Sequence, residues 1–428
     1  MGGMARFIIH GQRPLSGTVE LVGNKNAALP MIAACLLTDE PVILHRVPRI
    51  LDVQVMLELI ASLGVTVSGR GETVTLCAAQ LRRRRLDPEL CRRVRSSILF
   101  AGPLAARHGR AVLPPPGGDV IGRRRVDTHV NGFRALGIQT EVGRNYVFRR
   151  RQLRGADILL DEASVTATEN LLMAAALADG VTTLFNAACE PHVQDLGELL
   201  NGMGARITGL GTNRLRIEGV TRLHGAEHTL GPDYIELGSY FAAAAATGGA
   251  LTARGALDAT TLAVMQRTFI KLGVTWTVTP DRLVLTPRQR LRIRQEPGAE
   301  LPTIADGAWP AFPSDLMSVA IVLATQAAGS VLFFEKLFES RMYFVDRLLD
   351  MGAHIVQCDP HRVVVAGPSR LHGTPQSSPD LRAGMALIIA ALCARGETVM
   401  ENAQVIDRGY ERVDEKLRAL GADITRTE

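Results

Sequence analysis

The sequence predicts an α/β protein of two lobes, each built from three similar units. An amphipathic stretch that closes on a Leu-Gly or Met-Gly step occurs six times, and its closing glycines lie 67 to 79 residues apart: Gly64, Gly137, Gly204, Gly273, Gly352 and Gly421. A period this regular indicates a repeated supersecondary unit whose apolar faces need neighbours to cover them. The chain has 428 residues, of which 46% are hydrophobic, so it is too long for one compact core.

Within the first unit, helices and strands alternate. Four segments are expected in chain order: a helix over 27–37, a strand over 41–47, a helix over 53–63 and a strand over 65–69. The apolar residues of the second helix follow the helical period. Asp52 is expected to cap this helix, and Gly64 to end it in the left-handed conformation.

The lobes are expected to meet at Gly231 and Pro232, in the stretch HTLGPDYIELG between the third and fourth units. The lead strand RFIIHG is expected to join the second lobe. The predicted bounds are therefore 24–231 for the first lobe, which carries a mobile loop over 114–125, and 1–23 plus 232–428 for the second. A cleft between two lobes is a common place for a ligand, so the site is expected there.

The charge balance favours small anionic ligands. The chain has 48 basic and 43 acidic residues, a formal net charge of +5, and so small an excess does not predict a nucleic-acid surface. The runs Arg82–Arg85 and Arg149–Arg151 are interpreted as solvated turns, because no aromatic residues are interleaved for base stacking. We therefore expect small-molecule substrates and no nucleic-acid partner.

No motif indicates a metal, a cofactor or a membrane. The six cysteines form no CxxC pair and read as reduced thiols. His224 and His228 lie four residues apart but have no third ligand nearby. The longest apolar run, Met385–Ala394, is too short to span a bilayer, and the N-terminal residues form no secretory signal. A soluble, cytoplasmic and monomeric protein is expected.

Three arginines occupy nearly the same place in their units. Arg124, Arg341 and Arg408 lie 11 to 13 residues before the closing glycine, where a helix is expected to begin. Free amides and the helix dipole favour an anion there, and a guanidinium adds two parallel donors suited to phosphate or carboxylate. If the three converge, they would bind a small and highly charged anion. Alternatively, each arginine pairs with a nearby surface carboxylate, and the residues alone leave this open.

A set of motifs, in order along nearly the whole chain, resembles the UDP-N-acetylglucosamine 1-carboxyvinyltransferase family of enolpyruvyl transferases. The matching segments are GNKNAALPMIAACLL, VPRILDV, PPGGDVIGRRRVDTH, ASVTATENLLMAA, PAFPSDL, FESRMYFV, DLRAG and IDRGYERVDEKLRALGA. The glycine-serine-lysine-serine opening of the related EPSP synthases is absent, and GNKNAA stands in its place.

The resemblance implies a fold and a reaction. Each lobe would be an inside-out α/β barrel of three βαβαββ units. The enzyme would add the 3′-hydroxyl of UDP-N-acetylglucosamine to C2 of phosphoenolpyruvate and then eliminate phosphate, the first committed step of peptidoglycan synthesis. No cofactor is implied.

The resemblance also assigns residues. Lys25 and Asn26 would bind phosphoenolpyruvate, and Asp315 would take the proton of the attacking hydroxyl, although a buried structural aspartate is the alternative for this residue. Four arginines would hold the donor, on its phosphate (Arg124, Arg408) and its carboxylate (Arg341, Arg382). The residues implied at the nucleotide sugar are Arg95, Arg124, Arg125, Val126, Asp127, Thr128, Ser164, Val165, Asp315 and Leu337.

Asp119 stands where most of the family has a cysteine that donates the proton to C3. A carboxyl group can do the same work if loop closure and desolvation raise its pKa towards neutrality, although the nearby arginines act in the opposite direction.

Several other residues depart from the family pattern: Asn24, Arg125, Glu162, Thr166, Cys189 and Tyr234. A glutamate near a diphosphate would repel it unless the side chain points away. Two alternatives therefore stay open. The acceptor is another uridine nucleotide such as UMP, as in nucleoside-antibiotic pathways, or the chain is a non-catalytic paralogue that binds nucleotide sugar.

The aspartate at 119 predicts insensitivity to fosfomycin. This epoxide alkylates the family's cysteine, and a carboxylate is a much poorer nucleophile than a thiolate. Mass spectrometry of the protein after incubation with fosfomycin should show no adduct. Rapid and stoichiometric labelling at Asp119 would refute the prediction.

Overall fold

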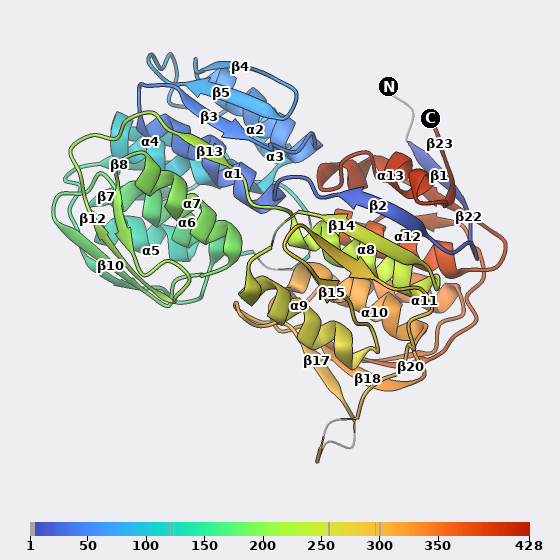
Figure 1. The fold of residues 1–428 in the computed structure, drawn as a ribbon. Coiled ribbons are helices and arrows are strands. Elements are labelled where there is room, and N and C mark those ends of the chain that lie inside the picture. Colours follow the sequence, from blue (N-terminus) through green and yellow to red (C-terminus); the bar gives the residue numbers. More distant parts are fainter. Residues whose placement is uncertain (1–4, 120, 123, 256, 296, 299–300) are drawn as a thin grey trace. The chain divides into compact units, whose positions relative to one another are not determined.

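The computed structural model describes residues 5–119, 121–122, 124–255, 257–295, 297–298 and 301–428 (Figure 1). The chain divides into two compact units. The first unit, as we call it here, consists of Gly23–Asp119 and Arg124–Gly231, and the second consists of Met1–Val22, Val120–Arg123 and Pro232–Glu428.

The loop expected over 114–125 is divided between these units, because Val120–Arg123 groups with the second one. The backbone N–H of Ser340 donates to the carbonyl oxygen of Ile121 at 3.2 Å, which accounts for this grouping. Val120 and Arg123 themselves lie outside the described residues.

The first unit contains three sheets, ordered β13-β3-β5-β4, β6-β8-β7 and β11-β12-β10-β9. Its strands are β3 (Val42–His45), β4 (Thr66–Arg70), β5 (Thr73–Cys77), β6 (Arg110–Leu113), β7 (Ile138–Val142), β8 (Tyr146–Arg150), β9 (Asp157–Leu159), β10 (Val181–Phe185), β11 (Arg206–Thr208), β12 (Arg214–Glu218) and β13 (Glu227–Thr229). Its helices are α1 (Lys25–Ala34), η1 (Cys35–Leu37), α2 (Leu51–Ser62), α3 (Pro88–Arg93), η2 (Arg95–Phe100), α4 (Ala101–His108), α5 (Asp127–Ala135), α6 (Val165–Ala175) and α7 (Pro191–Gly202), where η marks a 3-10 helix.

The second unit also contains three sheets, ordered β15-β16-β14-β2, β17-β18-β20-β19 and β21-β22-β1-β23. Its strands are β1 (Arg6–His10), β2 (Ser16–Glu20), β14 (Ala250–Arg254), β15 (Thr277–Val278), β16 (Arg282–Leu285), β17 (Thr303–Ala305), β18 (Gly329–Phe334), β19 (Ile355–Asp359), β20 (Arg362–Gly367), β21 (Gln376–Ser377), β22 (Glu397–Glu401) and β23 (Asp423–Thr427). Its helices are α8 (Tyr234–Ala246), α9 (Ala259–Lys271), η3 (Ser314–Leu316), α10 (Met317–Thr325), η4 (Arg341–Phe344), α11 (Val345–Asp350), α12 (Leu381–Cys393), η5 (Ala403–Arg408) and α13 (Val413–Ala419). The lead strand β1 lies between β22 and β23.

Across the described ranges, five of the six sheets share one topology. In the sheet of β9 to β12, for example, β9 runs parallel to β10, and the pairs β10 with β12 and β12 with β11 are antiparallel. The sheet of β6, β7 and β8 has three strands, but a parallel bridge between Arg85 and Val112 stands where the other sheets have their parallel strand. The structure therefore repeats one supersecondary unit six times.

The glycine that closes each of the six repeats has a left-handed conformation, as predicted for Gly64. A strand follows each of these glycines, and their φ angles lie between 81° and 105°: Gly64, Gly137, Gly204, Gly273, Gly352 and Gly421. This region is open to glycine and costly for residues with a Cβ atom, so the left-handed helix ends are confirmed.

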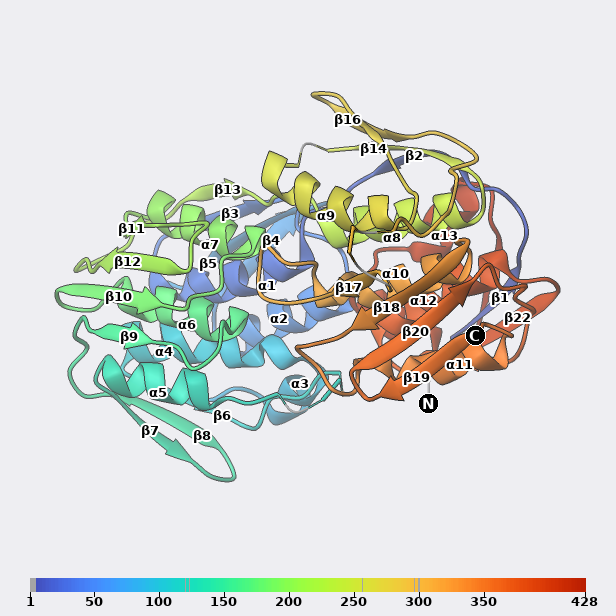
Figure 2. The ribbon, with the colours of Figure 1, turned by 90° about the horizontal axis from the view of Figure 1, so that it is seen from below.

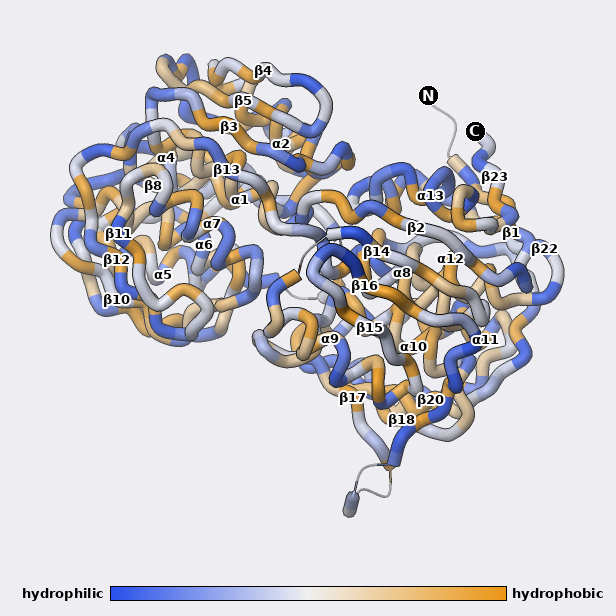
Figure 3. Tube along the Cα trace, in the orientation of Figure 1, coloured by the Kyte–Doolittle hydropathy of each residue, from blue (hydrophilic) through white to orange (hydrophobic). Residues whose placement is uncertain are grey.

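In each of the two compact units, the sheets surround a set of buried helices. In the second unit α8, α10 and α12 contact one another (Figure 2). Every residue of α10 is buried, and the hydropathy colouring of Figure 3 shows this helix as mainly hydrophobic. In the first unit α6 contacts both α1 and α4. A helix that is apolar on all sides is a core helix, so these helices form the centre and the sheets the outside. Along the described ranges, no helix is both long and apolar enough to cross a membrane.

One local prediction is wrong. Asp52 does not cap the second helix, because α2 begins at Leu51 and its N-cap is Ile50, which makes no side-chain cap hydrogen bond. The carboxylate of Asp52, in the first turn, instead contacts the ammonium group of Lys25.

A substitution at Gly137 tests the role of the closing glycines. A Cβ atom there would lie 1.9 Å from the carbonyl oxygen of Gln152, at a φ of 81°. Gly137→Ala should lower the free energy of unfolding by more than about 1 kcal/mol, measured by urea titration. Gly143→Ala is the matched control, because no atom lies within 4 Å of the added Cβ. Equal stability of the two variants would contradict the prediction.

Candidate functional site

Two arginines of the first unit lie together. Arg95 begins the 3-10 helix η2, and its Nη2 donates to the carbonyl oxygen of Arg124 at 2.6 Å. Burial and the neighbouring guanidinium of Arg124 lower the pKa of Arg95 to about 10. Burial is the larger cause, and the second cause is the repulsion between two positive charges, so this corner of the first unit favours an anion.

The double glycine brings the loop close to these arginines. Gly117 donates its N–H to the carbonyl oxygen of Cys91 at 3.0 Å, and a Cβ atom on Gly117 would lie 1.9 Å from the carbonyl oxygen of Arg92. Gly118 has a φ of 96°, and its Cβ atom would lie 2.8 Å from the Cβ of Arg95. Residues without side chains are needed for this approach, which leaves Asp119, half-buried, as the next side chain of the loop.

Lys25 forms a buried ion pair at the start of α1. Its Nζ lies 2.9 Å from Oδ2 of Asp52, and the two side chains are 7% and 6% exposed. Asn24 caps the helix, since its side chain accepts from the N–H of Ala27 at 3.1 Å. Asn26 follows and is half-buried. Sequence reasoning missed Asp52 as a partner of Lys25, because it assigned the carboxylate to a helix cap.

Six of the residues implied at the nucleotide sugar lie at the starts of two helices that contact each other, α5 and α6. Arg125 donates from Nε to Oδ1 of Asp127 at 3.0 Å, in the first turn of α5. This bond and the charge of Asp127 raise the pKa of Arg125, and the carboxylate of Glu162 acts in the same direction. Val126 is the N-cap residue of α5 and is half-buried, and Thr128 is buried.

A hydrogen-bond chain joins the two helix starts. Ser164 caps α6, accepting from the N–H of Ala167 at 3.4 Å, and Val165 follows it. Asn170 Nδ2 lies 3.1 Å from Nδ1 of His129, and Nε2 of His129 lies 3.1 Å from Oγ1 of Thr166. Burial and the charge of Arg95 lower the pKa of His129 to about 3, so its ring is neutral and Nε2 carries the hydrogen.

In the second unit, two arginines grip one carboxylate. Arg341 Nη2 lies 3.1 Å from Oδ1 of Asp315, and Arg382 Nη2 lies 3.0 Å from Oδ2. Both arginine side chains are 5% exposed, whereas that of Asp315 is 28% exposed. Burial would lower the pKa of Arg382, but the charges of Asp315 and Tyr410 outweigh it and raise the pKa.

Each of these arginines has a buried donor left over. Arg341 Nε and Arg382 Nη1 are buried and make no hydrogen bond to any described residue. Nε of Arg341 faces Glu335 at 3.9 Å, and the guanidinium of Arg382 lies over the ring of Tyr410, so both donors face the protein interior.

Two buried acidic residues, Glu335 and Asp306, lie near this site, and Glu335 faces Arg341. The side chain of Glu335 is not exposed at all, and Asp306 is 1% exposed. Ser314 Oγ donates to both carboxyl oxygens of Glu335, at 2.8 and 2.9 Å, and Nε of Arg341 lies 3.9 Å from Oε2. Burial and the hydrogen bond with Asp306 raise the pKa of Glu335 to about 9. Sequence reasoning missed both acids.

The remaining predicted site residues are more exposed to solvent. Arg408 ends η5 and is half-buried, and Leu337 is 46% exposed. Two of the residues that depart from the family pattern are buried. Cys189 is 8% exposed, and Tyr234 packs its ring against Trp309 with the centroids 5.9 Å apart.

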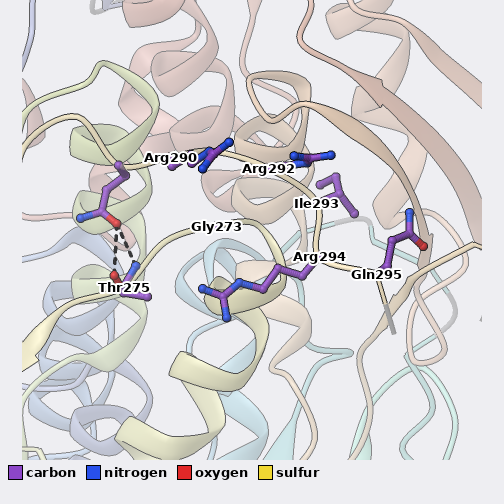
Figure 4. A pocket seen from close by; sticks show the side chains of 8 residues that line it. Gly273, Thr275, Arg290, Arg292, Ile293, Arg294 and Gln295 are labelled. Atoms are coloured by element: carbon purple, nitrogen blue, oxygen red, sulfur yellow. Dashed lines mark hydrogen bonds between the residues drawn. The ribbon is translucent and has the colours of Figure 1, made fainter. Parts of the chain in front are cut away.

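A separate recess of about 540 Å³ in the second unit is lined by none of the predicted site residues (Figure 4). It is lined by Gly273, Thr275, Gln289, Arg290, Arg292, Ile293, Arg294 and Gln295. Throughout the described ranges, no group of three or more His, Cys, Asp or Glu side chains is placed to hold a metal ion.

The chain is similar to known proteins over nearly its whole length. A UDP-N-acetylglucosamine 1-carboxyvinyltransferase of Bradyrhizobium diazoefficiens is 52% identical over 98% of this chain and 98% of its own length. The enzyme of that name from Treponema pallidum is 52% identical, covering 98% and 99% of the two chains, and that from Porphyromonas gingivalis is 44% identical, covering 99% and 100%.

Solved structures confirm the predicted fold class. The enolpyruvyl transferase NikO from Streptomyces tendae matches with a TM-score of 0.87 at 25% identity, over 100% of this chain and 99% of that one. An EPSP synthase from Acinetobacter baumannii matches with a TM-score of 0.74 at 15% identity, over 100% of both chains. The profile of the EPSP synthase (3-phosphoshikimate 1-carboxyvinyltransferase) family matches residues 9–417. The chain therefore belongs to the EPSP synthase family of enolpyruvyl transferases.

Proposed function

We propose that the chain transfers the enolpyruvyl group of phosphoenolpyruvate to the 3′-hydroxyl of UDP-N-acetylglucosamine and releases phosphate. The identity of 44% to 52% to full-length relatives of that name supports this acceptor. The observation that carries the proposal is Asp315, a partly exposed carboxylate at which two buried arginines meet. The reaction is the first committed step of peptidoglycan synthesis, and thus serves cell wall biogenesis, cell shape and division.

The donor carries a phosphate and a carboxylate, and we assign a set of cations to each. Arg341 and Arg382 bind the carboxylate, because both guanidinium groups meet at the partly exposed Asp315 and such groups suit an anion with two acceptor oxygens. Arg124 and Arg408, with Lys25 and Asn26, bind the phosphate.

Two carboxyl groups move the protons. Asp315 accepts the proton of the 3′-hydroxyl as its oxygen bonds to C2, and Asp119 donates a proton to C3. In the second step the C2–O bond to phosphate breaks and C3 loses a proton, which restores the double bond. General acid–base catalysis of this kind needs each group within hydrogen-bond reach of the proton that it moves.

The acceptor is assigned to the starts of α5 and α6. The N-terminal ends of the two helices present free amides and positive dipole ends, which favour a diphosphate. Arg95, Arg124, Arg125, Val126, Asp127, Thr128, Ser164, Val165, Asp315 and Leu337 are the proposed contacts. Glu162 raises the pKa of Arg125, so its charge is partly offset by a cation beside it.

We propose further that the protein acts in the cytoplasm, as a monomer, on small molecules and without nucleic acid, membrane, metal or cofactor. Its six cysteines are free thiols, which suits a reducing compartment.

A phosphate-release assay tests the acceptor. With phosphoenolpyruvate present, UDP-N-acetylglucosamine should support turnover and UMP should not. Asp315→Asn, which keeps the shape of the side chain but cannot take the proton, should lower kcat by about 10²- to 10⁴-fold. Release with UMP alone would favour the other uridine acceptor, and binding of nucleotide sugar without any release would favour the non-catalytic paralogue.

Variants of Asp119 test the proton donor. Asp119→Ala should abolish turnover, because no acid then reaches C3. Asp119→Cys should retain turnover within about tenfold and gain rapid covalent labelling by fosfomycin, since a thiolate opens the epoxide. Unchanged kcat in Asp119→Ala would exclude the assigned role.

A further inference from the structure

The buried acids Glu335 and Asp306 take no part in the proposed reaction, yet Glu335 contacts Arg341 directly. Glu335 follows β18 and Asp306 follows β17, and these two strands pair in parallel with Ala305 opposite Phe334. The two carboxyl groups therefore leave neighbouring strand ends side by side, and both are buried.

A single proton shared by this pair explains its burial. Two ionised carboxylates in contact inside a protein repel each other and lose their hydration, so one of them holds a proton. Burial and the neighbouring Asp306 raise the pKa of Glu335, and Oδ2 of Asp306 is buried without a donor among the described residues, so a proton on Glu335 can face it. The pair then carries one negative charge, and Oδ1 of Asp306 accepts from the N–H of Lys336.

The location of this charge matters to Arg341. Its Nε lies 3.9 Å from Glu335 Oε2 without a hydrogen bond, while its Nη2 holds Asp315 at 3.1 Å. An ionised Glu335 would attract the guanidinium and compete with Asp315 and with a substrate anion. A neutral Glu335 leaves the guanidinium to them.

We propose that Asp306 and Glu335 are positioning residues that keep Arg341 available to Asp315 and to the substrate carboxylate by sharing one proton between them. The proposal rests on the proposed function for the identity of that substrate. Neither acid is a catalytic residue, because Glu335 acts through Arg341 or through Ser314, the residue before Asp315, and Asp306 acts through Glu335.

Other groups that face Glu335 are few among the described residues. Arg341 and Ser314 face the carboxyl group, and Phe338 donates its N–H to Oε1 at 3.2 Å. His361 contacts the backbone carbonyl oxygen of Glu335 through Nδ1 at 2.7 Å, and the ammonium group of Lys336 lies over the ring of Phe334.

Two isosteric variants separate this role from a structural one. Glu335→Gln keeps a neutral group facing Arg341. Asp306→Asn removes the hydrogen bond and the charge of Asp306, which together with burial raise the pKa of Glu335, so that pKa falls and a negative charge forms on Glu335, beside Arg341. Both variants preserve volume and hydrogen-bonding capacity, so a purely structural role predicts that they behave alike.

The measurement is KM for phosphoenolpyruvate and kcat between pH 6 and pH 10. Asp306→Asn should raise KM roughly tenfold or more at pH 7 with little change in kcat, the size expected for a lost charged hydrogen bond. Glu335→Gln should keep the wild-type KM at pH 7 and lack the rise in KM that the wild type shows at alkaline pH. Equal effects of the two variants, or an unchanged alkaline rise in Glu335→Gln, would overturn the proposal.

A second readout does not depend on the reaction. Because the pKa of Glu335 is raised in the folded protein, the folded state binds more protons than the unfolded chain, and stability falls as pH rises from about 4.5 to about 9. The Tm of Glu335→Gln should fall less over this range than that of the wild type. Parallel Tm curves would refute the shared proton even if no turnover with phosphoenolpyruvate is found, whereas loss of turnover alone would count against the proposed function.

Discussion

The part of the site that lies in the second unit depends on one interaction. In it, two buried guanidinium groups hold the carboxylate of Asp315. Burying an arginine is unfavourable unless its charge is balanced and its donors are used. Asp315 balances Arg341 and Arg382, and it is itself partly exposed. The site thus stays stable without ligand and retains the capacity to bind an anion.

The repeat architecture explains why such groups collect where they do. Each unit of the repeat contributes one buried central helix, and proposed site residues lie at the start of five of these helices: Lys25 at α1, Arg95 before α4, Ser164 and Val165 at α6, Asp315 before α10, and Arg382 at α12. Helix starts offer free amides and a positive dipole end, so they suit an anionic substrate. The sixth, α8, begins instead with Tyr234, which packs on Trp309.

Charge in the buried part of the second unit is controlled by proton sharing as well as by ion pairing. Glu335 lies within reach of Arg341 and has Asp306 as a neighbour, and an ionised Glu335 would offset the charge of Arg341. Neutralising one acid with a proton leaves a balanced set of charges around Asp315. In the first unit, the neutral ring of His129 plays a comparable part, since it links Asn170 and Thr166 without adding charge beside Arg95.

The sequence by itself determined the sixfold repeat, because left-handed helix ends need glycine and therefore recur visibly at Gly64, Gly137 and their equivalents. The family motifs also predicted Arg341, Arg382 and Asp315 as site residues, and the structure brings these three together. Only the tertiary structure decided which distant residues meet. Asp52 was expected at a helix cap and lies against Lys25, and Asp306 and Glu335 meet because β17 pairs with β18. Such partners escape sequence reasoning because a buried ion pair or a shared proton depends on the pairing of separate segments, and no local spacing encodes that pairing.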